Sequence, residues 1–144
     1  MLRTRRTLLS LLLSSALAGC GGSQGTDPVP DDIGRAADRL QGEWMLTAFQ
    51  PAQPLEPMLQ TLLTAQLNTL TVTMRAGAMS VRGAGVQADR SYRIVQATED
   101  GFSGEVSDQT GVTYQITGQF QGLDLAFTTH TAPWQGSGRL HRAR

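Results

Sequence analysis

Polar and apolar residues alternate along most of the chain after residue 42, which is the pattern of strands with one buried face. The alternation is clearest over Val112–Phe120 and Leu123–Phe127, where every second residue is apolar or glycine. The eight predicted strands are Glu43–Gln50, Thr69–Arg75, Ala78–Arg82, Arg90–Ala97, Phe102–Ser107, Val112–Phe120, Leu123–Thr129 and Gln135–His141. Short turn-like links favour an antiparallel up-and-down meander that closes into a small eight-stranded barrel. Alternation alone also fits a sandwich of two sheets.

A segment between the first two strands has helical spacing instead. Its stripe recurs at i, i+3, i+4 and i+7 and consists of Leu55, Met58, Leu59, Leu62, Leu63, Gln66 and Leu67. Pro54 is expected in the first turn, and Glu56 suits the positive end of the helix dipole. We expect this helix to cap one barrel end by burying its mouth, or to act as a lid over a ligand cavity. A membrane-surface role is disfavoured because the segment has no Lys or Arg.

A shorter helix is predicted over Asp32–Leu40, ahead of the first strand. Ile33, Ala36, Ala37 and Leu40 lie on one side of it, and Asp31 is placed to cap its first turn. The chain therefore reads as an all-β domain with two accessory helices.

The first twenty residues have the features of an export signal. Met1–Arg6 holds three arginines and no acid, and Leu8–Leu17 is an apolar run of ten residues. A helix of that length rises roughly 15 Å, about half of a bilayer's hydrocarbon thickness, so it is too short for a stable span. A basic start followed by a short apolar run is typical of a secretory signal.

This signal ends in Leu17-Ala18-Gly19-Cys20, which resembles the signal of bacterial lipoproteins. The resemblance implies that Cys20 receives a diacylglyceryl group carrying fatty acids such as palmitate, and that cleavage occurs before it. In lipoproteins of this kind, an Asp directly after the cysteine favours retention in the inner membrane. Gly21 and Gly22 follow Cys20 here, so the resemblance implies a position in the outer membrane, facing the periplasm. The resulting division is a signal peptide over 1–19, a lipidated flexible tether over 20–32 and a barrel domain over 33–144.

The opening of the first strand, Gly42-Glu43-Trp44, resembles the lipocalin and calycin barrels. In that family the tryptophan closes the barrel floor and an arginine from the last strand packs over it. Arg142 is the better match here, and Arg139 is the second. The long helix after the first strand departs from the usual lipocalin arrangement, although fatty-acid-binding proteins place helices there.

The resemblance makes noncovalent binding of a small apolar ligand in the barrel the favoured function. The candidate ligand residues are Trp44, Met74, Tyr92, Tyr114, Phe127 and Trp134. Glycines at inward positions either leave room for a ligand or permit tight strand curvature; they are Gly104, Gly118, Gly136 and Gly138.

A solid-core interaction module is the alternative, for example a periplasmic protease inhibitor or an envelope assembly factor. Small eight-stranded inhibitors of bacterial metalloproteases have a similar opening of the first strand. They normally contain a disulfide, which the single cysteine of this chain cannot form internally.

Composition excludes several other classes of function. The 144 residues include 12 arginines, no lysine and 12 carboxylates, and removal of the first 19 residues leaves a net charge of about −3. A chain without a basic patch has no electrostatic footprint for nucleic acid. His130 and His141 lie outside any metal-ligand spacing, and no serine stands in a nucleophile elbow. We therefore expect no cofactor, no metal and no enzymatic activity.

Overall fold

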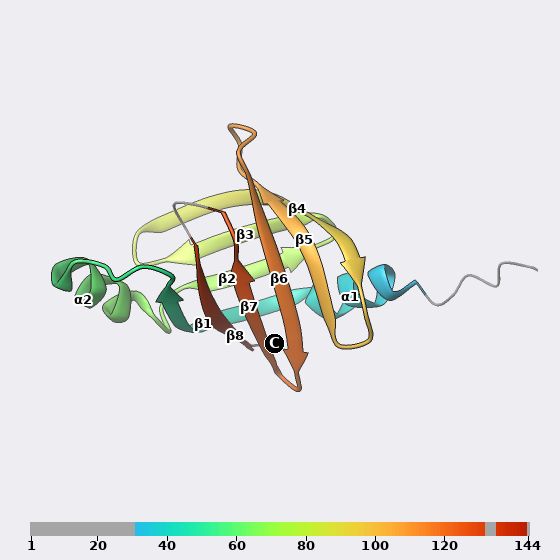
Figure 1. Cartoon of the computed structure of the whole chain (residues 1–144), viewed down its shortest axis with the longest axis horizontal. Coiled ribbons are helices and arrows are strands. Elements are labelled where there is room, and N and C mark those ends of the chain that lie inside the picture. Colours follow the sequence, from blue (N-terminus) through green and yellow to red (C-terminus); the bar gives the residue numbers. More distant parts are fainter. Residues whose placement is uncertain (1–30, 132–134, 144) are drawn as a thin grey trace, which may run out of the picture. The chain divides into compact units, whose positions relative to one another are not determined.

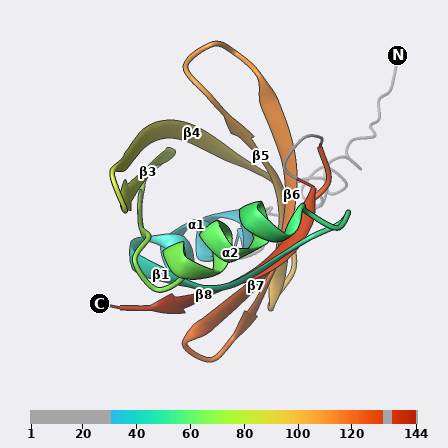
Figure 2. The same cartoon turned by 90° about the vertical axis from the view of Figure 1, so that its left-hand side faces the viewer.

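The strands pair in chain order around a closed ring, seen from the side in Figure 1 and from one end in Figure 2. The computed structural model describes residues 31–131 and 135–143. The elements are α1 (Asp32–Leu40), β1 (Gly42–Pro51), α2 (Pro57–Gln66), β2 (Thr71–Arg75), β3 (Ala78–Gly83), β4 (Val86–Ala97), β5 (Gly101–Ser107), β6 (Thr113–Gln121), β7 (Asp124–Thr129) and β8 (Gly136–Arg142). All neighbouring strands are antiparallel, and β8 closes on β1. The all-β, lipocalin-like barrel is therefore confirmed, and the sandwich is excluded.

The two ends of the barrel carry different helices. Because the strands run alternately up and down, the start of β1 and the end of β8 share one end with α1, while the β1–β2 connection that contains α2 lies at the other. Figure 1 shows the helices at opposite ends, and in Figure 2 α2 lies in front of the ring of strands. We call these the α1 end and the α2 end.

The α1 helix forms over the predicted residues and packs onto the barrel. The Asp31 side chain accepts a hydrogen bond of 3.1 Å from the Ile33 amide, which satisfies one of the unpaired donors of the first turn. Ala36 and Leu40 are buried, and the helix contacts β4 and β5. The predicted cap and the predicted bounds of this helix are both confirmed.

One strand begins four residues earlier than predicted, whereas the other seven begin within two residues of the predicted position. β4 starts at Val86 rather than Arg90, because Val86 pairs with Gly83 and the β3–β4 hairpin turns on only two residues. Both turn residues, Ala84 and Gly85, have positive φ, as the tightest hairpin turns require. The sequence Gln87-Ala88-Asp89 has weak strand propensity, and hairpin pairing overrides it.

Three of the inward-facing glycines are covered by phenylalanine rings rather than left open. A Cβ added at Gly118 would collide with the Phe102 ring, and one added at Gly138 would collide with the Phe127 ring. Phe49 lies in the same way over Gly136. Where phenylalanine and glycine face each other across neighbouring strands, as Phe127 and Gly138 do, the ring occupies the volume that the missing side chain leaves.

We expect Gly138→Ala to destabilise the fold by about 1–3 kcal/mol, because the added methyl meets both the Phe127 ring and the backbone carbonyl of Ala48. Urea unfolding monitored by circular dichroism measures the change. Gly34→Ala is the control, since its methyl makes only ordinary contacts within α1 and removes a helix-interior glycine. Equal stability of Gly138→Ala and the wild type would contradict the tight fit.

The contacts of the barrel are self-contained. All eight strand pairs and the core lie within Asp31–Arg144, which is one compact unit. This part of the chain therefore carries the contacts that it needs to fold on its own, and it can be studied as the barrel domain.

Candidate functional site

The floor of the barrel is built around Trp44 at the α1 end. Its side chain is 1% exposed, and the indole Nε1–H donates a 2.8 Å hydrogen bond to the Leu40 carbonyl. The Arg142 guanidinium lies 4.4 Å from the ring centroid of Trp44, a cation–π contact. Arg142 also donates to the Gln41 carbonyl at 2.9 Å and to the Arg39 carbonyl. The last strand is thereby fastened to the segment that joins α1 to β1.

The side chain of Arg139 points away from this floor. It pairs in register with Ala126 and Ala48 on the outer face and lies 3.8 Å from the Asp124 carboxylate. Gly42 has a φ of 127° directly before the first strand, a backbone conformation that favours glycine.

A second cation–π contact lies at the same end of the barrel. The Arg39 guanidinium is 4.0 Å from the Phe120 ring centroid, and it donates to the Glu99 carbonyl at 2.8 Å. The buried hydrophobic residues cluster here; they are Ala36, Leu40, Trp44, Val72, Met74, Phe120, Leu125 and Leu140. The α1 end of the barrel is therefore filled by side chains.

The inner wall is less buried farther from α1. The next inward positions toward the α2 end are only half-buried, although they face the interior of a closed ring; they are Leu46, Leu70, Val81, Tyr114, Ile116 and Phe127. Cross-strand register puts them on the inner face, since Val81 pairs with Val72 and Ile116 pairs with Gly104. Leu46, Val81 and Phe127 also pack against the buried cluster. The α2 half of the lumen is thus an apolar wall that solvent still reaches.

The predicted ligand residues divide between these two levels. Trp44 and Met74 are buried in the floor, whereas Tyr92, Tyr114 and Phe127 are half-buried on the inner wall. Burial raises the pKa of the Tyr92 phenol, so this group stays neutral at physiological pH. Two predicted residues, Cys20 and Trp134, lie outside the described part of the chain.

The expected packing of the α2 helix was wrong. We expected the helical stripe to bury one mouth of the barrel, yet no residue of α2 is buried. Leu63, Gln66 and Leu67 are half-buried, while the residues at i, i+3, i+4 and i+7 face solvent. We call these four the apolar stripe; they are Leu55, Met58, Leu59 and Leu62. Pro57, rather than Pro54, occupies the first turn.

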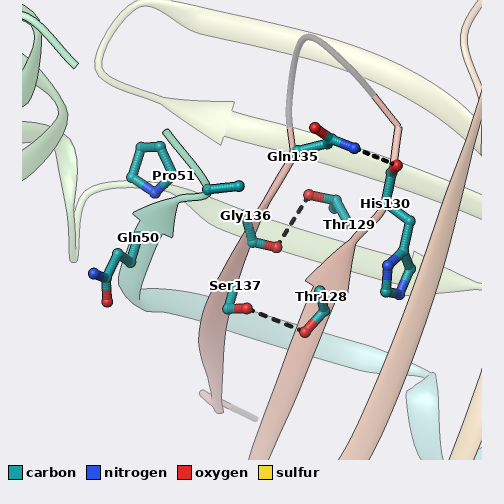
Figure 3. Close-up of a pocket in the computed structure, with 9 residues that line it drawn as sticks. Gln50, Pro51, Thr128, Thr129, His130, Gln135, Gly136 and Ser137 are labelled. Carbon is teal, nitrogen blue, oxygen red and sulfur yellow. Dashed lines mark hydrogen bonds between the residues drawn. The ribbon is translucent and has the colours of Figure 1, made fainter. Parts of the chain in front are cut away.

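A hollow of about 410 Å³ lies at the rim of the α2 end, where β1 ends, β7 ends and β8 begins (Figure 3). Its lining is mostly uncharged and polar, and consists of Gln50, Pro51, Ala52, Thr128, Thr129, His130, Gln135, Gly136 and Ser137. The Gln135 amide donates to the His130 carbonyl at 2.8 Å, and the Thr128 and Ser137 hydroxyls lie 3.2 Å apart. None of the predicted ligand residues that the structure describes lines this rim hollow, and no sequence motif marks it.

A second hollow, of about 400 Å³, lies across β5 to β8. Thr128 and Ser137 line both hollows, and Phe127 is the one predicted ligand residue in the second.

The two histidines each lie beside one polar side chain. His141 Nδ1 lies 2.6 Å from Asp124, and His130 Nε2 lies 3.0 Å from the Thr117 hydroxyl, both on the outer face. Among residues 31–131 and 135–143, no group of three potential ligands is placed to hold a metal ion. In the same residues, no helix has the length and apolar character needed to cross a bilayer.

In comparisons with known proteins, no family matches the chain and no curated protein sequence matches it.

Proposed function

We propose that this chain is a lipid-anchored protein of the bacterial cell envelope whose barrel binds a small apolar ligand noncovalently. The ligand occupies the α2 half of the lumen, above the Trp44 floor. Tyr114, Ile116 and Phe127 line it, and Leu46, Leu70 and Val81 complete the wall.

One observation carries the ligand proposal. Large apolar side chains that face the interior of a closed barrel are expected to be fully buried when the lumen is packed. Here the fully buried ones gather at the α1 end, next to the half-buried Met79 and Phe102, and those toward the α2 end are only half-buried. An apolar wall that solvent reaches is the usual lining of a small-molecule site, and covering it with an apolar ligand removes that surface from water.

The anchor proposal is supported by the sequence of residues 1–20. The basic start, the short apolar run and Leu17-Ala18-Gly19-Cys20 occur in register. A thiol is the reactive group that a lipid transfer requires, and two or three acyl chains anchor a protein stably. Gly21 and Gly22 favour the outer membrane, facing the periplasm.

Native mass spectrometry tests the ligand proposal. Residues 31–144, exported to the periplasm behind a cleavable signal peptide and purified without detergent, are expected to carry a noncovalent adduct that organic extraction releases. Ions at the bare chain mass alone, both as purified and after incubation with fatty acids, alkanols and sterol-like compounds, would rule out the ligand proposal.

A solid-core interaction module is the second candidate, and the covered glycines favour it. Phe49, Phe102 and Phe127 occupy the space beside Gly136, Gly118 and Gly138, which narrows the lumen. Such a protein would yield bare chain mass in native mass spectrometry and would instead retain a protein partner after crosslinking in the envelope.

A further inference from the structure

The apolar stripe holds four of the nine large apolar side chains that are exposed among the described residues, and the proposed ligand site uses none of the four. Met58 is 74% exposed, Leu62 is 52% exposed and Leu59 is 49% exposed on α2, and Leu55, 37% exposed, lies just before the helix. Single exposed apolar residues are ordinary, but a contiguous stripe on a helix marks an interaction surface. Figure 2 shows that α2 lies outermost at its end of the barrel, so a broad partner can reach it.

The two hydroxyl groups of α2 already have partners within the helix. The Thr61 hydroxyl donates to the Pro57 carbonyl at 2.9 Å, and the Thr64 hydroxyl donates to the Gln60 carbonyl at 2.8 Å. Pro57, as the first residue of the helix, has no amide hydrogen that would need a partner. Moving a hydroxyl group out of water costs less free energy when the hydroxyl already has a hydrogen-bond partner in the protein. The hydroxyls of α2 have such partners, so this helix can enter a poorly hydrated environment at a lower cost.

The charge of the segment excludes an electrostatic partner. α2 has no charged residue, and Glu56, immediately before it, is the one charge between Pro51 and Met74. A surface held by charge pairs would need basic or acidic side chains, as would a helix attracted to anionic lipid. The missing Lys and Arg, which disfavoured a membrane-surface role in the sequence, count against attraction to anionic lipid but not against insertion of apolar side chains. The exposed side chains of the stripe fit the interfacial region of a bilayer, where apolar side chains enter the acyl boundary.

We propose that the apolar stripe docks the open α2 end of the barrel onto the bilayer that holds the lipid anchor. The geometric part of this proposal rests on the proposed anchor at Cys20. The eleven residues from Cys20 to Pro30 span up to about 37 Å when extended, whereas a tilted ten-residue strand rises about 25 Å. The tether is therefore long enough for the end opposite α1 to reach the membrane.

The anchor also explains how so small a stripe suffices. Four side chains give weak binding to a membrane from free solution. A tether converts this binding into an intramolecular step at high effective concentration. Docking at this end would let a lipid-derived apolar ligand enter the α2 half of the lumen without crossing water.

Vesicle flotation of residues 31–144 tests the docking without the anchor. Because binding without the tether is weak, the domain is expected to float in part, at a high concentration of phosphatidylcholine vesicles. Neither anionic lipid nor high salt should change its partition coefficient appreciably, because no charge contributes. The double substitution Met58→Gln and Leu62→Gln is expected to lower this coefficient about tenfold. Leu123→Gln is the matched control, since Leu123 is 61% exposed in the β6–β7 turn at the α1 end, and it should float like the wild type.

Three results would overturn the docking proposal. They are absence of wild-type flotation, equal flotation of the double variant when circular dichroism shows it folded, and stripe-dependent dimers in sedimentation without vesicle binding. The last would assign the stripe to a second copy of the chain. None of these results bears on the proposed function, because ligand mass and fatty-acid labelling of Cys20 are measured separately.

Discussion

Trp44→Ala is expected to destabilise the barrel domain by about 3–5 kcal/mol, a larger loss than we expect from Gly138→Ala. Trp44 is the largest fully buried side chain, and it contacts the core at the point where α1, β1 and β8 meet. Its removal leaves a cavity under the Arg142 guanidinium and an unpaired Leu40 carbonyl. Because small β domains are marginally stable, we expect a large shift of the urea midpoint or failure to accumulate.

Two milder variants measure separately how much the Trp44 hydrogen bond and the Arg142 contacts contribute to the stability of the domain. Trp44→Phe keeps an aromatic face for Arg142 but loses the hydrogen bond to Leu40, and a loss of about 1–2 kcal/mol is expected. Arg142→Leu removes the cation–π contact and both donated hydrogen bonds while retaining an apolar stem. If Trp44→Ala unfolds at the wild-type urea midpoint, the floor is not the principal core of this barrel.

Cys20→Ser is expected to abolish lipidation completely. A serine hydroxyl does not ionise near neutral pH, so it cannot replace the thiolate as the nucleophile toward a lipid donor. In cells grown with an alkyne-tagged palmitate analogue, the wild-type chain should take up label and the variant none. The variant should also leave the membrane fraction or retain its leader.

Gly22→Ser is the control for this experiment, because it changes a neighbouring residue and leaves Leu17-Ala18-Gly19-Cys20 intact. It should be labelled like the wild type. Label that persists in the Cys20→Ser chain would show that lipid attaches elsewhere and would remove the anchor from the proposed function.

The sequence was sufficient to predict the sheet, because polar and apolar residues alternate along a strand that buries only one face. All eight strands and the Asp31 cap of α1 follow from local pattern, and the barrel closes as expected. The start of β4 at Val86 does not follow, because it depends on pairing with Gly83 rather than on the propensities of its own residues. Tertiary pairing overrides weak local preference there.

The site was harder to predict, because periodicity shows which residues share a face but not what that face meets. The spacing of Leu55, Met58, Leu59 and Leu62 identified a stripe, yet the stripe faces solvent instead of the barrel. The contact of Phe127 with Gly138 depends on cross-strand register, which the sequence does not supply. The sequence did place Arg142 on the inner face. Side chains alternate between the two faces of a strand, so Arg142 shares the face of Leu140, two residues before it.

A titration with N-phenyl-1-naphthylamine, a neutral apolar fluorophore, tests most directly whether the lumen binds ligand. Residues 31–144 are expected to bind the probe saturably. Ile116→Trp, which fills the lumen beside Gly104, should abolish binding, while Gln115→Trp on the exposed face of the same strand should leave it intact. Equal binding by both variants, or no saturable binding by the wild type, would contradict a ligand in the α2 half of the barrel.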